Sequence, residues 1–371
     1  MFKCKKIVLL AALAVAGAAH AQADKWIIGQ SAPLSGGNAK FGQDIRDGAN
    51  AWFAAVNARG GVQGKAIELL SIDDKNDRKQ AGVNAGTLLE NKDVLALFGF
   101  ASATLSLDAL PQAEKKGAAF FGPFSGANPV RTNSPVLFTV RASYGEEMEK
   151  MLKFWTSLGL TRVTVVHYDD EVGKQNLDVV VEYLKKINLQ PQALPLKRNA
   201  TIGKSEIQTL LAQNPQFLLN TALSGAAAQI QKELVAQGRM IPTSSLSFVG
   251  ADQYIAAAGA ASAGVSIAQV VPSPTSSIPA VRECAQALEA SGVKTPMNTT
   301  HLEACFGAKV VAEGLRRAKK PVTRQSLVES LATLGSYDLG GYKITFGNGV
   351  QHGSKFVELA MVTRDGKLST R

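Results

Sequence analysis

Two glycine-containing loops carry the side chains with the clearest binding chemistry in this chain. Gly99–Thr104 and Gly122–Gly126 each follow a short apolar run that predicts a buried strand. The first loop offers the hydroxyls of Ser102 and Thr104 and leads into a predicted helix. Hydroxyls and free backbone N–H groups at a helix start suit a carboxylate, and the helix dipole adds to the attraction. Ser102 could equally be a simple helix N-cap, which the same residues would satisfy.

A candidate partner for the opposite charge stands later in the chain. Asp252 follows Gly250-Ala251 at the end of an apolar run, Leu246–Val249, which predicts another strand. Its carboxylate could cap the next helix or pair with the ammonium group of a ligand. Both interpretations stay open on the sequence alone.

The residues required for catalysis or for a metal site do not come together in the sequence. The four histidines are far apart, and no nucleophile motif stands beside a base. Gly60–Lys65 has one residue too few between its glycines for a phosphate loop, and Ala66 stands where Ser or Thr should hold magnesium. We therefore expect no enzyme, no cofactor and no metal. An exported α/β hydrolase is the rival hypothesis, although it would need a nucleophile with a histidine in reach.

Strands that alternate with helices must position these loops. In Trp26–Asp74 a strand, a loop, an amphipathic helix and a second strand follow one another, as in a right-handed βαβ unit. The alternation continues, with a single helix predicted over Ala103–Lys116. It is interrupted near Arg141–Tyr144 and again at Pro272–Ser277. This order predicts an α/β fold with parallel sheets in two lobes, which the chain crosses more than once.

The N-terminal segment has the pattern of an export signal. Three lysines precede an apolar stretch, Ile7–Ala16, and A-x-A sites end at Ala21 and Ala23. We expect residues 1–23 to be a signal peptide, cleaved near Ala21–Ala23, and the protein to be periplasmic. Cleavage removes three lysines and no acidic residue, which lowers the formal net charge from +10 to +7. The remaining basic residues are scattered, so we expect no nucleic-acid partner.

Two cysteines remain after that segment, Cys284 and Cys305, each within a helical pattern. In an oxidising compartment they could form a disulfide or stay free, and their spacing does not decide between the two.

Several short motifs in this order resemble the type I periplasmic binding proteins, specifically the leucine/isoleucine/valine-binding group of ABC importers. They are Ile28–Gly36 (IGQSAPLSG), Asn57–Gly64 (NARGGVQG), Asp73-Asp74 and Phe248–Asp252 (FVGAD). The resemblance implies two Rossmann-like lobes joined by a three-stranded hinge, a ligand trapped by closure, and a membrane permease as partner. We expect a monomer, with lobe 1 formed by residues 24–142 and 273–348 and lobe 2 by residues 143–272 and 349–371.

The resemblance also assigns roles to individual residues. Hydroxyls at two positions would take the ligand carboxylate, a backbone segment would hold the carboxylate and the ammonium, and an acidic residue would pair with the ammonium. Aromatic and polar side chains would line the rest of the pocket or its rim. In that order, the positions are Ser102 and Thr104; Phe124, Ser125 and Gly126; Asp252; and Phe41, Thr300 and Tyr144.

Two positions depart from the branched-chain amino-acid binders. Those proteins carry aromatic residues where this chain has Val172 and Leu223, and the Ser102 loop is one residue shorter. The aliphatic side chains should leave the cleft wider and more apolar. A branched-chain or other apolar amino acid is the first choice of ligand, with a neutral amide or an aromatic or aliphatic carboxylate as alternatives. A ligand-sensing regulator of the same fold is a further alternative.

Overall fold

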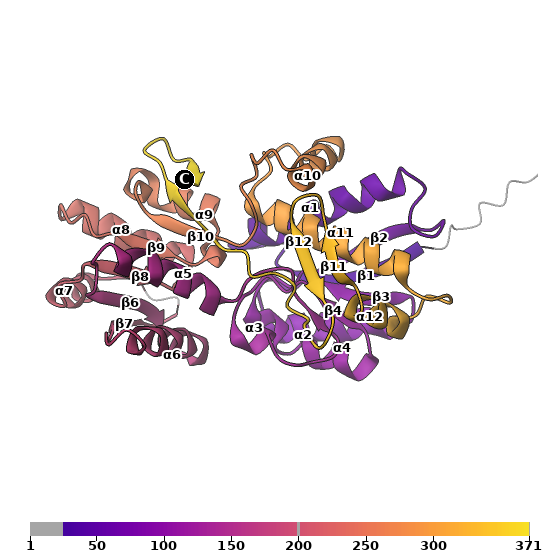
Figure 1. Cartoon of the computed structure of the whole chain (residues 1–371), viewed down its shortest axis with the longest axis horizontal. Helices are drawn as coiled ribbons and strands as arrows, with labels where there is room; N and C mark the ends of the chain where they lie inside the picture. Colours follow the sequence, from indigo (N-terminus) through magenta and orange to yellow (C-terminus); the bar gives the residue numbers. More distant parts are fainter. Residues whose placement is uncertain (1–24, 199–200, 371) are drawn as a thin grey trace, which may run out of the picture.

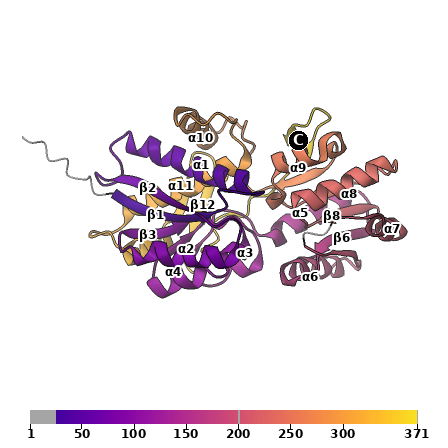
Figure 2. The ribbon, with the colours of Figure 1, turned by 180° about the vertical axis from the view of Figure 1, so that it is seen from behind.

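The protein forms two α/β lobes side by side (Figures 1 and 2). A computed structural model describes residues 25–198 and 201–370, so the expected signal peptide lies outside the described residues. The two sheets confirm the expected two-lobed architecture. None of the helices in the described ranges has the length and apolar character needed to cross a membrane. The residue boundaries given above for the lobes stay a prediction.

A five-stranded parallel sheet in the order β2-β1-β3-β4-β5 forms the centre of lobe 1. The middle strand β3 is buried along its whole length, as expected for a strand covered by helices on both faces. The strands are β1 (Lys25–Ala32), β2 (Ala66–Asp73), β3 (Val94–Phe98), β4 (Ala119–Phe121) and β5 (Leu137–Phe138).

Helices cover this sheet, and two of them approach each other closely. α1 buries Ile45, Trp52 and Phe53 in the lobe 1 core. A Cβ atom on Gly48 of α1 would lie 2.3 Å from the carbonyl oxygen of His301 in α11, so only glycine permits this contact. The lobe 1 helices are α1 (Ala39–Asn57), α2 (Arg78–Glu90), α3 (Ala103–Ser106), α4 (Leu110–Lys116), α10 (Pro279–Ala290), α11 (Thr299–Arg317) and α12 (Arg324–Ala332), and a hairpin of β11 (Gly335–Asp338) and β12 (Lys343–Phe346) completes the lobe.

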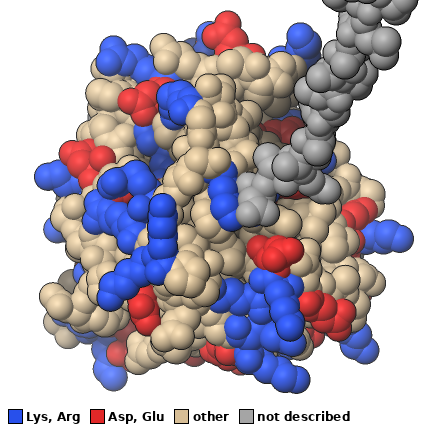
Figure 3. Space-filling model, turned by 90° about the vertical axis from the view of Figure 1, so that its right-hand side faces the viewer, with Lys and Arg blue, Asp and Glu red and all other residues tan. Residues whose placement is uncertain are grey.

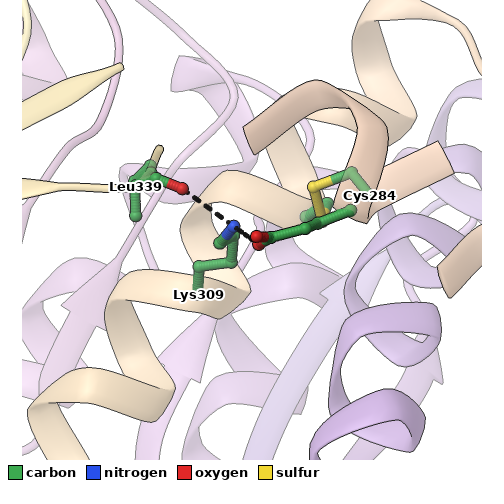
Figure 4. The surroundings of a disulfide bond; sticks show 5 residues. Cys284, Lys309 and Leu339 are labelled. Carbon is green, nitrogen blue, oxygen red and sulfur yellow. Dashed lines mark hydrogen bonds and ion pairs between the residues drawn. A yellow bond between two sulfur atoms is a disulfide. The ribbon is translucent and has the colours of Figure 1, made fainter. Parts of the chain in front are cut away.

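A disulfide joins α10 to α11. Cys284 and Cys305 lie with their sulfur atoms 1.97 Å apart, which resolves the alternatives left open by the sequence. Beside it, the buried Lys309 donates hydrogen bonds to Glu283 at 2.5 Å and to the carbonyl oxygen of Leu339 at 3.0 Å (Figure 4). The bond and this ion pair hold α10, α11 and the β11–β12 hairpin together.

Lobe 2 contains a seven-stranded sheet in the order β14-β13-β10-β9-β8-β6-β7. Five strands run parallel, and the two C-terminal strands are added antiparallel at one edge. The strands are β6 (Val163–Tyr168), β7 (Gln192–Leu196), β8 (Phe217–Asn220), β9 (Thr243–Ser245), β10 (Ser266–Gln269), β13 (Glu358–Val362) and β14 (Leu368–Thr370). The helices are α5 (Tyr144–Ser157), α6 (Glu171–Lys185), α7 (Lys204–Ala212), α8 (Ser224–Ala236) and α9 (Ala251–Ala258), with short 3₁₀ turns η2 (Ser247–Val249) and η3 (Gly259–Ser262), whereas the 3₁₀ turn η1 (Asn128–Val130) lies between β4 and β5 of lobe 1.

Two predicted elements are wrong. The single helix expected over residues 103–116 is broken into α3 and α4, because Pro111 lacks the N–H needed inside a helix and instead stands in the first turn of α4. The strand expected at Leu246–Val249 ends earlier, at Ser245, and is followed by η2. The backbone N–H of Ser247 donates to the carboxylate of Glu147 at 2.7 Å, which draws this segment out of the sheet.

The chain passes between the lobes after β5, after β10 and after β12. The hydroxyl of Tyr342 lies within hydrogen-bonding distance of all three crossover segments. It lies 3.3 Å from the carbonyl oxygen of Val140, 2.9 Å from that of Val270 and 2.9 Å from the hydroxyl of Ser354. A β-bridge between Thr139 and His352 pairs the first segment with the third. These contacts form the hinge.

Candidate functional site

The carboxyl ends of both sheets lie at the hinge. The first crossover segment leaves lobe 1 directly after β5, and the second leaves lobe 2 directly after β10, both of them strands of the parallel arrays. The loops that follow parallel strands therefore gather on the side of each lobe nearest the crossovers. This places the predicted binding loops of the two lobes at one boundary.

Two of the lobe 1 loops are bonded to each other. The N–H of Gly99 donates to the carbonyl oxygen of Phe121 at 3.0 Å, and the N–H of Phe124 donates to that of Phe100 at 2.8 Å. Ser102 is partly buried, and its hydroxyl accepts from the N–H of Leu105 at 3.2 Å. Ser102 is thus the N-cap of α3, and Thr104 is exposed on that helix. Neither hydroxyl lines the pocket described below.

The second loop packs against the start of lobe 2. A Cβ on Gly126 would lie 2.7 Å from the backbone nitrogen of Tyr144, so the close approach requires glycine. The buried Ser125 hydroxyl donates to the phenol oxygen of Tyr144 at 3.2 Å. Burial raises the pKa of Tyr144 to about 12. The Tyr144 ring in turn lies 5.2 Å from that of Phe248, centre to centre. The predicted residues Ser125, Gly126 and Tyr144 are therefore in mutual contact.

A small pocket of about 20 Å³ lies between the lobes beside the crossover segments. Three predicted residues line it: Phe41 and Phe124, whose rings meet edge to face at 6.1 Å, and Thr300 at the start of α11. The remaining lining residues are Arg141, Ser247, Phe248, Gln269, Val270, Val271, Thr299 and Glu303. Lobe 1, lobe 2 and two crossover segments all contribute to this wall.

Buried charges form one side of the pocket. The guanidinium of Arg141 lies 3.6 Å from Glu303 of lobe 1 and 3.7 Å from Glu147 of lobe 2. It also donates a hydrogen bond to the hydroxyl of Ser247. Burial raises the pKa of Glu147 to about 6, although Arg141 and Ser247 oppose the shift. Burial likewise raises the pKa of Glu303, with Arg141 opposing. Arg141 therefore links the two lobes electrostatically at the hinge.

The predicted residues of lobe 2 follow three of its parallel strands. Val172 lies in the first turn of α6, Leu223 at the start of α8, and Asp252 in the first turn of α9. Val172 and Leu223 are partly buried against the lobe 2 core, whereas Asp252 is exposed. None of the three lines the small pocket. They share the carboxyl edge of the lobe 2 sheet.

A larger groove lies at the opposite end of lobe 1, at the amino ends of the strands. Its wall contains more basic than acidic residues, the acidic ones being Glu68 and Asp93, and Figure 3 shows both signs of charge on this end of the molecule. The groove contains none of the predicted site residues. We place the candidate site at the hinge, because in the described part of the chain predicted residues of lobe 1 meet residues of lobe 2 there.

Sequence reasoning missed the polar side chains of the hinge pocket. Arg141 follows an apolar run and is the first residue of the predicted break at Arg141–Tyr144, and its single charge was the only local sign of a role. Glu303 lies inside a long helix, 162 residues further along the chain, and nothing in its local sequence marks it. Gln269 and Ser247 likewise come from segments that only the fold brings together.

The chain is similar to known proteins over most of its length. Residues 25–367 match the family model described as periplasmic binding protein. Among curated relatives, an amino acid binding protein of Pseudomonas aeruginosa is 27% identical over 213 residues, which are 56% of each protein. Leu/Ile/Val-binding protein homolog 2 of Brucella abortus is 25% identical over 239 residues, which are 62% of each. The matches thus span less than two thirds of these relatives.

A solved structure is similar over nearly its whole length. The crystal structure of a substrate-binding periplasmic protein from Ralstonia solanacearum is 29% identical and superposes with a TM-score of 0.86. The match covers 93% of this chain and 99% of that one.

Proposed function

This chain belongs to the periplasmic binding protein family, and on that premise we propose that it is the exported solute-binding receptor of an ABC importer. It traps a small carboxylate-bearing ligand between its lobes and carries out no catalysis. The mature protein acts in the periplasm as a monomer, after removal of residues 1–23, and presents its closed form to a membrane permease.

The observation that carries this proposal is the pocket at the hinge. Phe41, Phe124 and Thr300 belong to lobe 1, whereas Phe248 and Gln269 belong to lobe 2. A pocket that takes its walls from both lobes changes shape when the lobes move. A ligand held there favours the closed arrangement over the open one by its differential affinity for the two.

The mechanism follows from the positions of the loops. The ligand docks first on lobe 1. There the Ser102 hydroxyl, the Thr104 hydroxyl and the backbone at Phe124–Gly126 hydrogen-bond to its carboxylate. Closure then brings the carboxyl edge of the lobe 2 sheet over it, with Val172 and Leu223 as apolar cover. Asp252, exposed in the first turn of α9, pairs with the ammonium of an amino acid.

An amino acid is the ligand class that the relatives' names support, and the aliphatic pair Val172 and Leu223 favours an apolar one. A neutral amide or an aromatic or aliphatic carboxylate is the second candidate. The specific observation in its favour is the polar wall of the hinge pocket, where Arg141 and Glu303 face the space.

A thermal-shift panel tests the proposal. L-leucine, L-isoleucine, L-valine, L-asparagine, isobutyramide and benzoate would each be added to the mature chain. A ligand at a hundred times its dissociation constant should stabilise the fold by about 2.7 kcal/mol. If none of these compounds raises the melting temperature, the proposed ligand classes are wrong.

Ser102→Ala tests the carboxylate assignment. The lost hydrogen bond should weaken a carboxylate ligand by about 1–3 kcal/mol in calorimetric titration. Ser102→Thr is the matched control, because it keeps both the hydroxyl and the helix cap. Equal affinity in the alanine variant would place the carboxylate elsewhere.

A further inference from the structure

The hinge pocket contains a buried hydrogen-bond donor with no acceptor. The Arg141 side chain is 3% exposed, and its Nε atom has no hydrogen-bond partner within the described part of the chain. The carboxylates of Glu147 and Glu303 lie at 3.7 and 3.6 Å, which suffices for an ion pair but is too long for a hydrogen bond. A guanidinium has five N–H donors, and here it makes one hydrogen bond, to Ser247. Arg141 lines the pocket, and most of its N–H donors are not committed to hydrogen bonds with the described residues.

The same pocket contains an acceptor with no donor. Glu147 accepts from the Ser247 N–H at 2.7 Å and from its hydroxyl at 2.8 Å, so its carboxylate is satisfied by the protein. Glu303 differs, because among the described residues its carboxylate forms one ion pair, with Arg141, and accepts no hydrogen bond, and it lines the pocket. Its side chain is only 8% exposed. The pocket wall therefore contains a guanidinium and a carboxylate that form an ion pair at 3.6 Å but no hydrogen bond with each other.

Resting on the proposed function, we propose that the ligand end buried at the hinge is a neutral carboxamide-class group. Its carbonyl oxygen accepts from Arg141, and its N–H groups donate to Glu303. The carboxylate end of the same ligand lies toward the Phe124–Gly126 loop, whose Phe124 is part of the pocket wall.

Other end groups fit this wall less well. An aliphatic end satisfies neither Arg141 nor Glu303, and each buried group left unpaired weakens binding by about tenfold or more. A second carboxylate meets Arg141 but also faces Glu303 and Glu147, so its charge is repelled twice. An ammonium meets Glu303 but faces the Arg141 cation. A neutral group that both accepts and donates can match both, and a carboxamide does so with one acceptor and two donors.

The size and the remaining lining agree with this assignment. The cavity of about 20 Å³ has room for one small group and not for a large ring. Thr300 and Gln269 add a hydroxyl and an amide to its wall, next to the Phe41 and Phe124 rings. These polar side chains can hydrogen-bond to the edge of a planar amide, while the rings flank it.

Isosteric ligands test the inference. L-asparagine, L-leucine and L-aspartate have side chains of nearly the same shape that end in an amide, an aliphatic group and a carboxylate. Succinamate, 4-methylpentanoate and succinate repeat the comparison without an amino group. Calorimetric titration of the mature chain should show the amide of at least one triple binding at least about tenfold tighter than both of its isosteres.

Glu303→Gln locates the effect. The amide ligand should lose about tenfold or more in affinity, while the aliphatic isostere changes little. Glu313→Gln is the matched control, because Glu313 lies on the same helix but pairs with Arg316 and Arg317 away from the pocket. Thr300→Val provides a second variant with little effect on folding. It should reduce the difference in affinity between the amide and the aliphatic ligand.

The outcomes separate this inference from the function on which it rests. If in neither triple the amide binds about tenfold tighter than its aliphatic isostere, although members of the triples bind, the inference is overturned while the receptor function stands. If Glu303→Gln and Glu313→Gln change amide affinity equally, the assignment to Glu303 is wrong. If no member of either triple binds, both the proposed ligand class and the inference fail.

Discussion

Replacing Tyr342 by phenylalanine should destabilise the hinge without disturbing its packing. The hydroxyl lies 2.9 Å from the carbonyl oxygen of Val270, 3.3 Å from that of Val140 and 2.9 Å from the Ser354 hydroxyl. The ring is retained in the variant, and with it the contacts to Phe306 at 4.8 Å and to Phe356 at 5.6 Å between ring centres. The expected change is therefore that of the hydroxyl alone.

The magnitude follows from the groups left without a partner. One phenol hydrogen donates to one carbonyl at a time, so the variant leaves the Val270 carbonyl without its donor, whereas the Ser354 hydroxyl keeps the Phe356 N–H as a partner at 3.1 Å. Val270 is 3% exposed and Ser354 6%, so water does not readily replace the lost partner. At about 1–3 kcal/mol for one buried unpaired group, we expect the free energy of unfolding to fall by about 1–3 kcal/mol.

Urea denaturation followed by circular dichroism measures this loss as a lower midpoint. Tyr337→Phe is the matched control, because this tyrosine lies on the same hairpin, is only partly buried and makes no hydrogen bond through its hydroxyl to any residue that the structure describes. The control should change the free energy of unfolding by less than about 0.5 kcal/mol. If the Tyr342 variant behaves like the control, the hydroxyl does not hold the crossover segments together.

Three further perturbations test separate parts of the structure. Reducing the Cys284–Cys305 bond, which closes a loop with a sequence separation of 21, should lower the free energy of unfolding by about 3 kcal/mol, and reductant should leave the Cys284→Ala/Cys305→Ala variant unaffected. Burial raises the pKa of Asp74 to about 6, so its contribution to stability is complete below about pH 4 and is lost as the pH rises through 6. As the pH rises from 4 to 7, the free energy of unfolding of Asp74→Asn, measured by urea denaturation, should therefore increase relative to that of the wild type by up to about 3 kcal/mol. A difference between the two proteins that does not change with pH would contradict this. Asp252→Asn should weaken an amino acid far more than an acid without an ammonium in calorimetry, and equal losses would remove Asp252 from the site.

Much of the fold could be predicted because its determinants are local. The apolar periodicity of Trp26–Asp74 sets strand, helix and strand within fifty residues, and the same holds along most of the chain. The errors arose where a distant residue or a proline overrides the pattern. Glu147 takes the backbone N–H of Ser247 a hundred residues away, and Pro111 divides one apolar stretch into two helices.

The site was predictable only in part, for the same reason. Phe41, Phe124 and Thr300 were placed by resemblance to a family, and they line one pocket. Arg141 and Glu303 belong to no motif, and their contact depends on how α11 packs against the first crossover segment. In the proposed complex, Arg141 and Glu303 set the polarity around the buried end of the ligand. They therefore influence the choice of ligand more than the predicted residues Phe41, Phe124 and Thr300 do.

Small-angle X-ray scattering with the best-stabilising compound tests the central claim most directly. The claim is that one ligand engages both lobes and closes them about the hinge, so saturation should lower the radius of gyration of the mature chain. The decrease should follow the same binding curve as the rise in melting temperature. A ligand that raises the melting temperature but leaves the radius of gyration unchanged would show that it binds without closure, and the account of lobe trapping would be wrong.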